Sequence, residues 1–219
     1  MGLCAGVQTG AAIVLSGITL ENSTRTWPSA VAKATAVAEH YVKVAEAFLL
    51  EDETVDAENY VNKATAYIGD VVDKHLQLRY KATHGKVLDA NRKFLEAARM
   101  FYELSQTPTS LIRSDDLLVL LGKAATCAVL GKAGPQRDRI LGLLCKDERL
   151  ASLDAVDGYG THAQVLTKMH RQHILRRADL RAFEDGLMEH QKALMADGLT
   201  IPQRAIIEHN MAAAFKVYE

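Results

Sequence analysis

The chain has 219 residues, of which 48% are apolar and 24% charged, and its formal net charge is −1. This length and composition are typical of one or two globular domains with a hydrophobic core, and the near-zero charge excludes a chain that binds nucleic acid through its overall charge. Three cysteines without CxxC spacing exclude a disulfide framework and a zinc site, and they indicate reduced thiols in an intracellular protein. No apolar run reaches the roughly 20 residues needed to span a membrane.

Helix-forming residues dominate the chain, which has only four prolines and no segment with the alternation of a strand. The N-terminal segment Met1–Cys4 is similar to an acylation signal, but Gly6 stands where Ser or Thr is expected. We interpret the first helix as the second half of a hairpin whose first half precedes the sequence. In chain order, the predicted helices cover residues 8–18, 28–50, 55–68, 74–90, 92–106, 117–130, 135–145, 161–177, 178–192 and 203–218.

The helices in the first half of the chain repeat a pattern of small and large residues. Ala45 precedes Ala57 by 12 residues, and Gly85 precedes Ala97 by the same interval. Small residues are needed where paired helices approach closely, and large ones fill the neighbouring grooves. The second-helix positions 57, 97 and 137 are 40 residues apart, although Arg137 departs from the small-residue rule. The pattern predicts tetratricopeptide-like hairpins.

No combination of residues predicts an enzyme. Gly131-Lys132 lacks the earlier glycine, the following Ser or Thr and the preceding strand of a phosphate-binding loop. His170 and His173 are three residues apart on a predicted helix, but no carboxylate lies beside them at a ligand's spacing. We interpret these histidines as a solvated or hydrogen-bonded pair, and the sequence predicts no cofactor.

Two stretches concentrate charge of one sign. The acidic stretch has Glu46, Glu51, Asp52, Glu53, Asp56 and Glu58, and the basic stretch has Lys168, Arg171, Arg176, Arg177 and Arg181. Each stretch is either a solvated helix face or a docking surface for a protein partner. Nucleic acid is the less favoured partner, because aromatic residues do not alternate with the basic ones.

Several segments together carry a resemblance to a known family. They are Arg92–Ala98, Tyr102–Ser105, Lys146–Arg149, His190–Ala193, Ala196–Gly198 and Arg204–Asn210. In this order they resemble the PCI-domain subunits of the COP9 signalosome, and similar segments recur from about residue 10 to the end. The related subunits of the proteasome lid are the alternative within the same family.

The resemblance implies an all-α fold, a right-handed α–α superhelix of tetratricopeptide-like hairpins that leads into the helical part of a PCI domain. We expect helical repeats over residues 1–107, and a further repeat with the helical PCI subdomain over residues 108–219. Family members continue into a winged helix that the sequence lacks, so we expect a truncated chain. Its last helix is apolar over most of its circumference, so it needs cover on two sides, and the missing winged helix would supply the second. In this chain we therefore expect an exposed apolar patch near Phe215 and weak self-association.

The function implied by the resemblance is that of a non-catalytic scaffold and substrate-sensing subunit. The signalosome removes the ubiquitin-like protein NEDD8 from cullin-RING ubiquitin ligases, so the expected partners are other signalosome subunits and that ligase, in nucleus and cytoplasm. No membrane partner is expected. From another functional class, a tetratricopeptide-type adaptor that binds an extended peptide remains open. The candidate docking residues are Lys168, Arg171, Arg176, Arg177, Arg181 and Phe215.

Overall fold

The described part of the chain is helical. The computed structural model describes residues 5–18, 20 and 26–217, and Met1–Cys4, with the possible acylation signal, lies outside them. Within these residues no strand forms, and the one β-type contact is an isolated antiparallel bridge between Leu194 and Thr200. The predicted all-α class is therefore confirmed. The same residues contain no helix that is both long and apolar enough to cross a membrane.

The chain forms two compact units, which divide between Val87 and Leu88, inside a helix. The predicted boundary at residue 107 concerned repeats and the PCI subdomain, and it stays a prediction. The first unit holds α1 (Ala5–Ser16), α2 (Ala30–Leu50), α3 (Thr54–Ile68) and most of α4 (Lys74–Ala90). Its core is continuous along the α2–α3 hairpin and receives Leu76, Tyr80 and Val87 from α4. Ser29 begins α2, where its hydroxyl accepts a hydrogen bond from the amide of Ala32.

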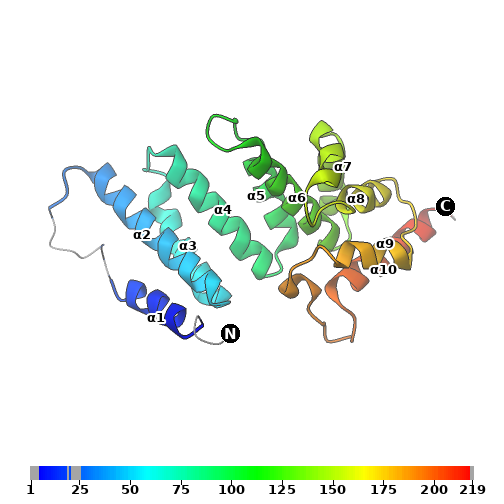
Figure 1. Cartoon of the computed structure of the whole chain (residues 1–219), viewed down its shortest axis with the longest axis horizontal. Coiled ribbons are helices and arrows are strands. Elements are labelled where there is room, and N and C mark those ends of the chain that lie inside the picture. Colours follow the sequence, from blue (N-terminus) through cyan, green and yellow to red (C-terminus); the bar gives the residue numbers. More distant parts are fainter. Residues whose placement is uncertain (1–4, 19, 21–25, 218–219) are drawn as a thin grey trace. The chain divides into compact units, whose positions relative to one another are not determined.

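The second unit begins with the end of α4, and its most extensive helix contact is between α5 and α6. Figure 1 shows the order of its elements in green to red. They are α5 (Phe94–Ser105), α6 (Ser114–Leu130), α7 (Pro135–Cys145), the 3₁₀ turn η1 (Glu148–Ala155), α8 (His162–His170), α9 (Arg177–Glu184), the 3₁₀ turn η2 (Glu189–Lys192) and α10 (Ile201–Val217).

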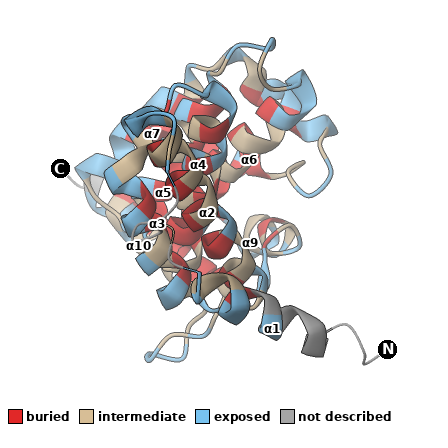
Figure 2. Ribbon diagram, turned by 90° about the vertical axis from the view of Figure 1, so that its left-hand side faces the viewer, coloured by how far each residue is buried: buried red, intermediate tan, exposed pale blue. Residues whose placement is uncertain are grey.

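The structure confirms a 40-residue period. The helices α2, α4, α6 and α8 end at residues 50, 90, 130 and 170. Second-helix positions 57, 97 and 137 are all buried, and the positions four and seven residues after each are buried too. Figure 2 shows the buried positions gathered on helix faces that meet other helices. The helical side chains therefore pack by the predicted pattern, and Arg137 occupies a buried position where the first two repeats have alanine.

Non-glycine residues form three of the turns that end the helices. Asp52, Arg92 and Gln172 have φ angles of 58°, 60° and 58°, in the left-handed region. After each, the next amide donates a hydrogen bond to the carbonyl five residues earlier, as from His173 to Lys168 at 2.8 Å. This is the Schellman arrangement, which closes a helix and satisfies its last carbonyls.

The turn at Gln172 shows that two predicted helices were wrong. The helix expected over residues 161–177 ends at His170, because Gln172 reverses the backbone. The helix expected over residues 178–192 is instead α9, which ends at Glu184, followed by the short turn η2. Glycine and proline, the usual signals of a helix end, are absent from residues 171–175, so the sequence gives no signal for the end of this helix.

Candidate docking surface

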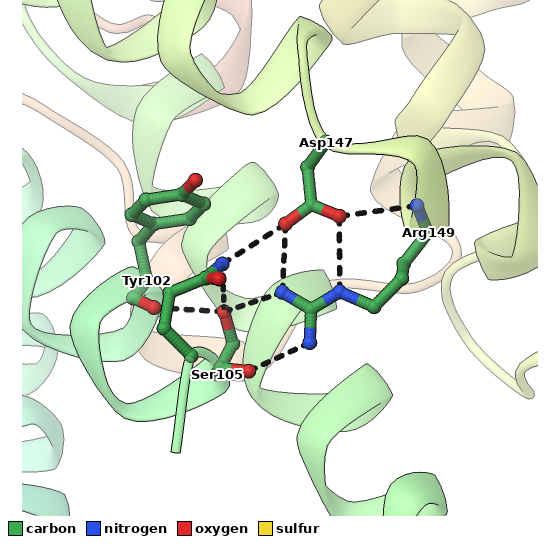
Figure 3. Close-up of polar contacts among 5 residues, drawn as sticks. Tyr102, Ser105, Asp147 and Arg149 are labelled. Atoms are coloured by element: carbon green, nitrogen blue, oxygen red, sulfur yellow. Dashed lines mark hydrogen bonds and ion pairs between the residues drawn. The ribbon is translucent and has the colours of Figure 1, made fainter. Parts of the chain in front are cut away.

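A group of hydrogen bonds, which we call the polar latch, joins η1 to the end of α5 (Figure 3). The guanidinium of Arg149 donates two hydrogen bonds to the carboxylate of Asp147, at 2.9 and 2.7 Å, and a third to the carbonyl of Ser105 at 2.6 Å. The side chain of Gln106 donates to Asp147 at 3.0 Å. The hydrogen bond from Arg149 holds the pKa of Asp147 below its usual range. These contacts fix the segment that leads from α7 into α8.

A buried carboxylate holds η2 in place. Asp89, at the end of α4, accepts hydrogen bonds from Nε2 of Gln191 on both of its oxygens, at 3.0 and 2.9 Å. The thiol of Cys127 donates to it at 3.5 Å. Nε2 of His190 lies 3.2 Å from the same carboxylate, at ion-pair distance but without the orientation of a hydrogen bond. The carboxylate therefore joins segments 102 residues apart in the sequence.

Two residues of α10 hold the segment between α8 and α9. The ring of His209 donates to the carbonyl of His173 at 2.9 Å. The side-chain amide of Asn210 makes two hydrogen bonds with the backbone of Leu175, accepting at 2.9 Å and donating at 2.8 Å. This pairing presents the beginning of α9, with its arginines, beside α10.

The structure divides the predicted basic stretch into two surfaces. Lys168 is paired with Asp179 at 2.6 Å, and this hydrogen bond lowers the pKa of Asp179. Lys168 and Arg171 line a depression beside α7 and α8. The remaining three, Arg176, Arg177 and Arg181, are exposed along another groove. The five residues are therefore near in sequence but do not form one continuous rim.

The second groove lies between α9 and α10 and has a volume of about 470 Å³. We call it the α9–α10 groove. Its polar lining is the three arginines with Glu184, Gln203 and Asn210, and its apolar lining is Leu175, Leu180, Leu199, Ile206 and Ile207.

The helix α10 has two apolar faces, of which it buries one. Ile201, Ala205, His209 and Ala213 follow at intervals of four and are all at most 5% exposed. On the opposite side Ile207, Met211 and Phe215 are 44%, 56% and 70% exposed. The described part of this helix therefore buries one side only, and the exposed apolar patch that we expected near Phe215 is present as a row of apolar side chains. We call this row the α10 stripe.

The other candidates have different surroundings. Glu46 of the acidic stretch is engaged in internal contacts. It forms an ion pair with Arg79 of α4 and accepts a hydrogen bond from Thr83 at 3.1 Å. His170 ends α8, while His173 lies beyond the turn, so the two imidazoles do not share a helical face. No group of three His, Cys, Asp or Glu among the described residues could hold a metal ion.

Comparison with known proteins identifies the family. The chain is 38% identical over 208 residues to COP9 signalosome complex subunit 4 of Drosophila melanogaster, covering 95% of this chain and 48% of that protein. The same subunit of Arabidopsis thaliana is 36% identical over 218 residues, covering 95% and 51%, and that of Neurospora crassa is 36% identical over 212 residues, covering 96% and 45%. The chain belongs to the family of COP9 signalosome subunit 4. It spans about half the length of these curated relatives, and no protein-family model matches it.

The segments that resemble the subunit 4 family contain the internal polar contacts described above. Asp147 and Arg149 form the latch, Gln191 binds Asp89, and His209 and Asn210 hold the connection before α9. None of the candidate docking residues lies in these segments. These segments therefore serve internal contacts, whereas the case for a docking surface depends on the geometry of α9 and α10.

Sequence reasoning missed Asp89, which is only 7% exposed, and the role of Gln191. The one available signal was an acidic residue inside the otherwise buried end of a helix, at residues 87–89. Its partner is too far away in the sequence for any spacing rule to connect them.

Proposed function

We propose that the chain is a non-catalytic scaffold subunit of a COP9 signalosome. The observation that supports this most directly is its identity of 36–38% to subunit 4 of three organisms along nearly its whole length. Hairpins that repeat every 40 residues suit such a role, because stacked repeats offer extended surfaces to protein partners.

The proposal includes the expected details of that role. The second half of the chain is the helical part of a PCI domain, and the partners are other signalosome subunits and the cullin-RING ligase from which the complex removes NEDD8. The chain senses that substrate and acts in nucleus and cytoplasm. Lys168, Arg171, Arg176, Arg177, Arg181 and Phe215 are its proposed docking residues.

The test is capture of partner subunits by the tagged 219-residue chain from a eukaryotic cell extract, with quantification by mass spectrometry. We expect signalosome subunits to be enriched. Enrichment of proteasome-lid subunits instead, or of chaperones that carry a peptide ligand, would contradict the proposal in favour of one of the two alternatives.

Charge reversal tests the docking residues in the same experiment. Arg171→Glu with Arg176→Glu and Arg177→Glu should reduce capture, with the largest effect at low salt, because exposed charges are screened as ionic strength rises. Reversal of Arg99, Lys132 and Arg139, which are also exposed in the second unit, is the matched control. Equal capture by both variants across a salt series would indicate that the basic residues form a solvated helix face and not a docking surface.

A further inference from the structure

The α9–α10 groove and the α10 stripe form one surface, and we propose that it binds an acidic amphipathic helix of a protein partner. This inference rests on the docking role proposed above and adds the chemistry of the partner. It also limits the basic residues that bind this partner to Arg176, Arg177 and Arg181, because only these three border the groove.

The floor of the groove is apolar. Leu175 and Ile206 are 3% and 5% exposed, and Leu180 and Leu199 are half-buried beside them. A volume of about 470 Å³ lies within the range of sites that enclose organic ligands, so the groove has room for apolar side chains of a partner.

The uncharged polar groups of the groove already have internal partners. The side chain of Gln203 accepts a hydrogen bond from the amide of Thr200 at 3.1 Å, and Asn210 is paired with the backbone of Leu175. Glu184 accepts a hydrogen bond from the hydroxyl of Thr200 at 3.3 Å. Recognition therefore falls to the apolar floor and to the charges at the rim.

Positive charge dominates the rim. Three exposed arginines border the groove against one carboxylate, that of Glu184. Within the described residues, no carboxylate is at ion-pair distance from the guanidinium of Arg177 or Arg181, whereas Lys168 and Arg204 nearby are paired with Asp179 and Asp197. Guanidinium groups bind carboxylates in a planar, two-pronged geometry, so the free rim fits Asp or Glu of a partner.

The α10 stripe indicates that the partner is a helix. Ile207, Met211 and Phe215 are four residues apart, so they form one ridge about 12 Å long. A ridge of this kind packs into the groove of a second helix, as in other helix-in-groove complexes. Ile207 lies both in the ridge and in the lining of the groove, which makes the two apolar surfaces continuous.

Charge argues against two other occupants. A second copy of α10 would bring Arg204 and a single acidic residue, Glu208, to a rim that is already positive. Nucleic acid would match the arginines, but its phosphates would gain nothing from Leu175, Ile206 or Ile207. An acidic amphipathic helix satisfies the floor, the rim and the stripe together.

The probe is a fluorescein-labelled peptide of about 18 residues, roughly five helical turns. It carries Leu along one face and Glu on both flanks, and its binding to the full chain is followed by fluorescence anisotropy. A second peptide has Lys in place of every Glu, and a third has the same composition scrambled so that the leucines share no face. We expect the first peptide to bind and the other two to bind at least about tenfold more weakly.

Two sets of variants locate the binding site. Arg176→Glu with Arg177→Glu and Arg181→Glu, and separately Ile207→Ser with Phe215→Ser, should each raise the Kd about tenfold or more. The matched controls are Arg99→Glu with Lys132→Glu and Arg139→Glu, and Leu143→Ser, which is 44% exposed on α7 like Ile207 on α10. These controls should leave the Kd within about twofold. Circular dichroism verifies that every variant keeps its helices.

Three results would overturn the proposal. They are equal binding of the acidic and basic peptides, a Kd unaffected by the charge reversals at α9, and a homodimer in sedimentation that excludes the peptide from the groove. The result of this peptide-binding experiment can be distinguished from the result of the capture experiment. A chain that captures signalosome subunits but binds no acidic peptide refutes only the groove, and the converse result refutes only the proposed function.

Discussion

Two arginines of the second unit, one partly exposed and one buried, differ in how well their guanidinium groups are paired. Arg149 binds both oxygens of Asp147 and the carbonyl of Ser105, so most of its donors are used. Arg137 is 2% exposed, yet Nη1 donates only a long bond of 3.3 Å to the carbonyl of Gly131, and Nε has no partner among the described residues. Burial lowers the pKa of the Arg137 guanidinium. We therefore expect Arg149 to stabilise the fold and Arg137 to contribute little to its stability.

Replacement of each arginine by methionine should separate these roles. Arg149→Met leaves Asp147 and the Ser105 carbonyl without their main donor, and we expect a loss of about 1–3 kcal/mol of unfolding free energy. Arg137→Met replaces a poorly paired buried charge by an apolar side chain of similar length, and we expect a change within about 1 kcal/mol, in either direction. Urea denaturation of both variants measures the difference. An equal loss in both would show that Arg137 is as well paired as Arg149.

The helices themselves are specified mainly by the spacing of small and apolar residues. Ala57, Val61 and Ala64 of α3 are fully buried, and their counterparts Ala97, Phe101 and Leu104 of α5 are at most 1% exposed. In α7 the positions 137, 141 and 144 are buried in the same order. The register of each hairpin is therefore set by a few positions that recur every 40 residues.

A substitution in this register tests it. Ala97→Leu inserts a branched side chain at a position of α5 that is 0% exposed, in the helix that packs along α6. Overpacking at such a site should lower the unfolding free energy by about 1–3 kcal/mol, which a thermal melt detects. Arg99→Leu, at an exposed position of the same helix, is the control and should have little effect. A melting temperature unchanged by Ala97→Leu would mean that the repeat alignment is wrong.

Periodicity predicted the helices up to Cys145 within a few residues, because one apolar face recurs there at regular intervals. It failed over residues 161–192, where Gln172 adopts a left-handed conformation that its residue type does not announce. The candidate docking residues were found from their charge, but the separation of Lys168 from the three groove arginines depends on Asp179 and on the turn at Gln172. Such tertiary pairings leave no mark in local spacing.

At the scale of the whole molecule, global stability depends on internal polar groups that are held in one charge state. His162 is 0% exposed and lies between the rings of Tyr159 and Phe183, with centroids 5.2 and 4.6 Å away. Burial lowers its pKa from 6.5 to about 4. Asp147, with an ordinary pKa of 3.8, is held ionised to lower pH by Arg149. Protonation of His162 therefore affects the unfolding free energy in mildly acidic solution, whereas protonation of Asp147 affects it only in stronger acid.

The unfolding free energy should therefore fall in two stages as the pH is lowered. Between pH 6.5 and about 4 the unfolded chain binds a proton at His162 that the folded chain does not, so stability decreases by an amount on the order of 3 kcal/mol from this group. Below the ordinary pKa of 3.8, protonation of Asp147 removes the contribution of its pairing with Arg149. Urea titrations of the parent and of His162→Leu at a series of pH values separate the stages. The variant should lose the first stage and keep the second, since an apolar side chain of similar size has no proton to bind. If the two proteins lose stability in parallel from pH 6.5 to 4, then His162 is not the buried neutral group and other histidines cause the decline.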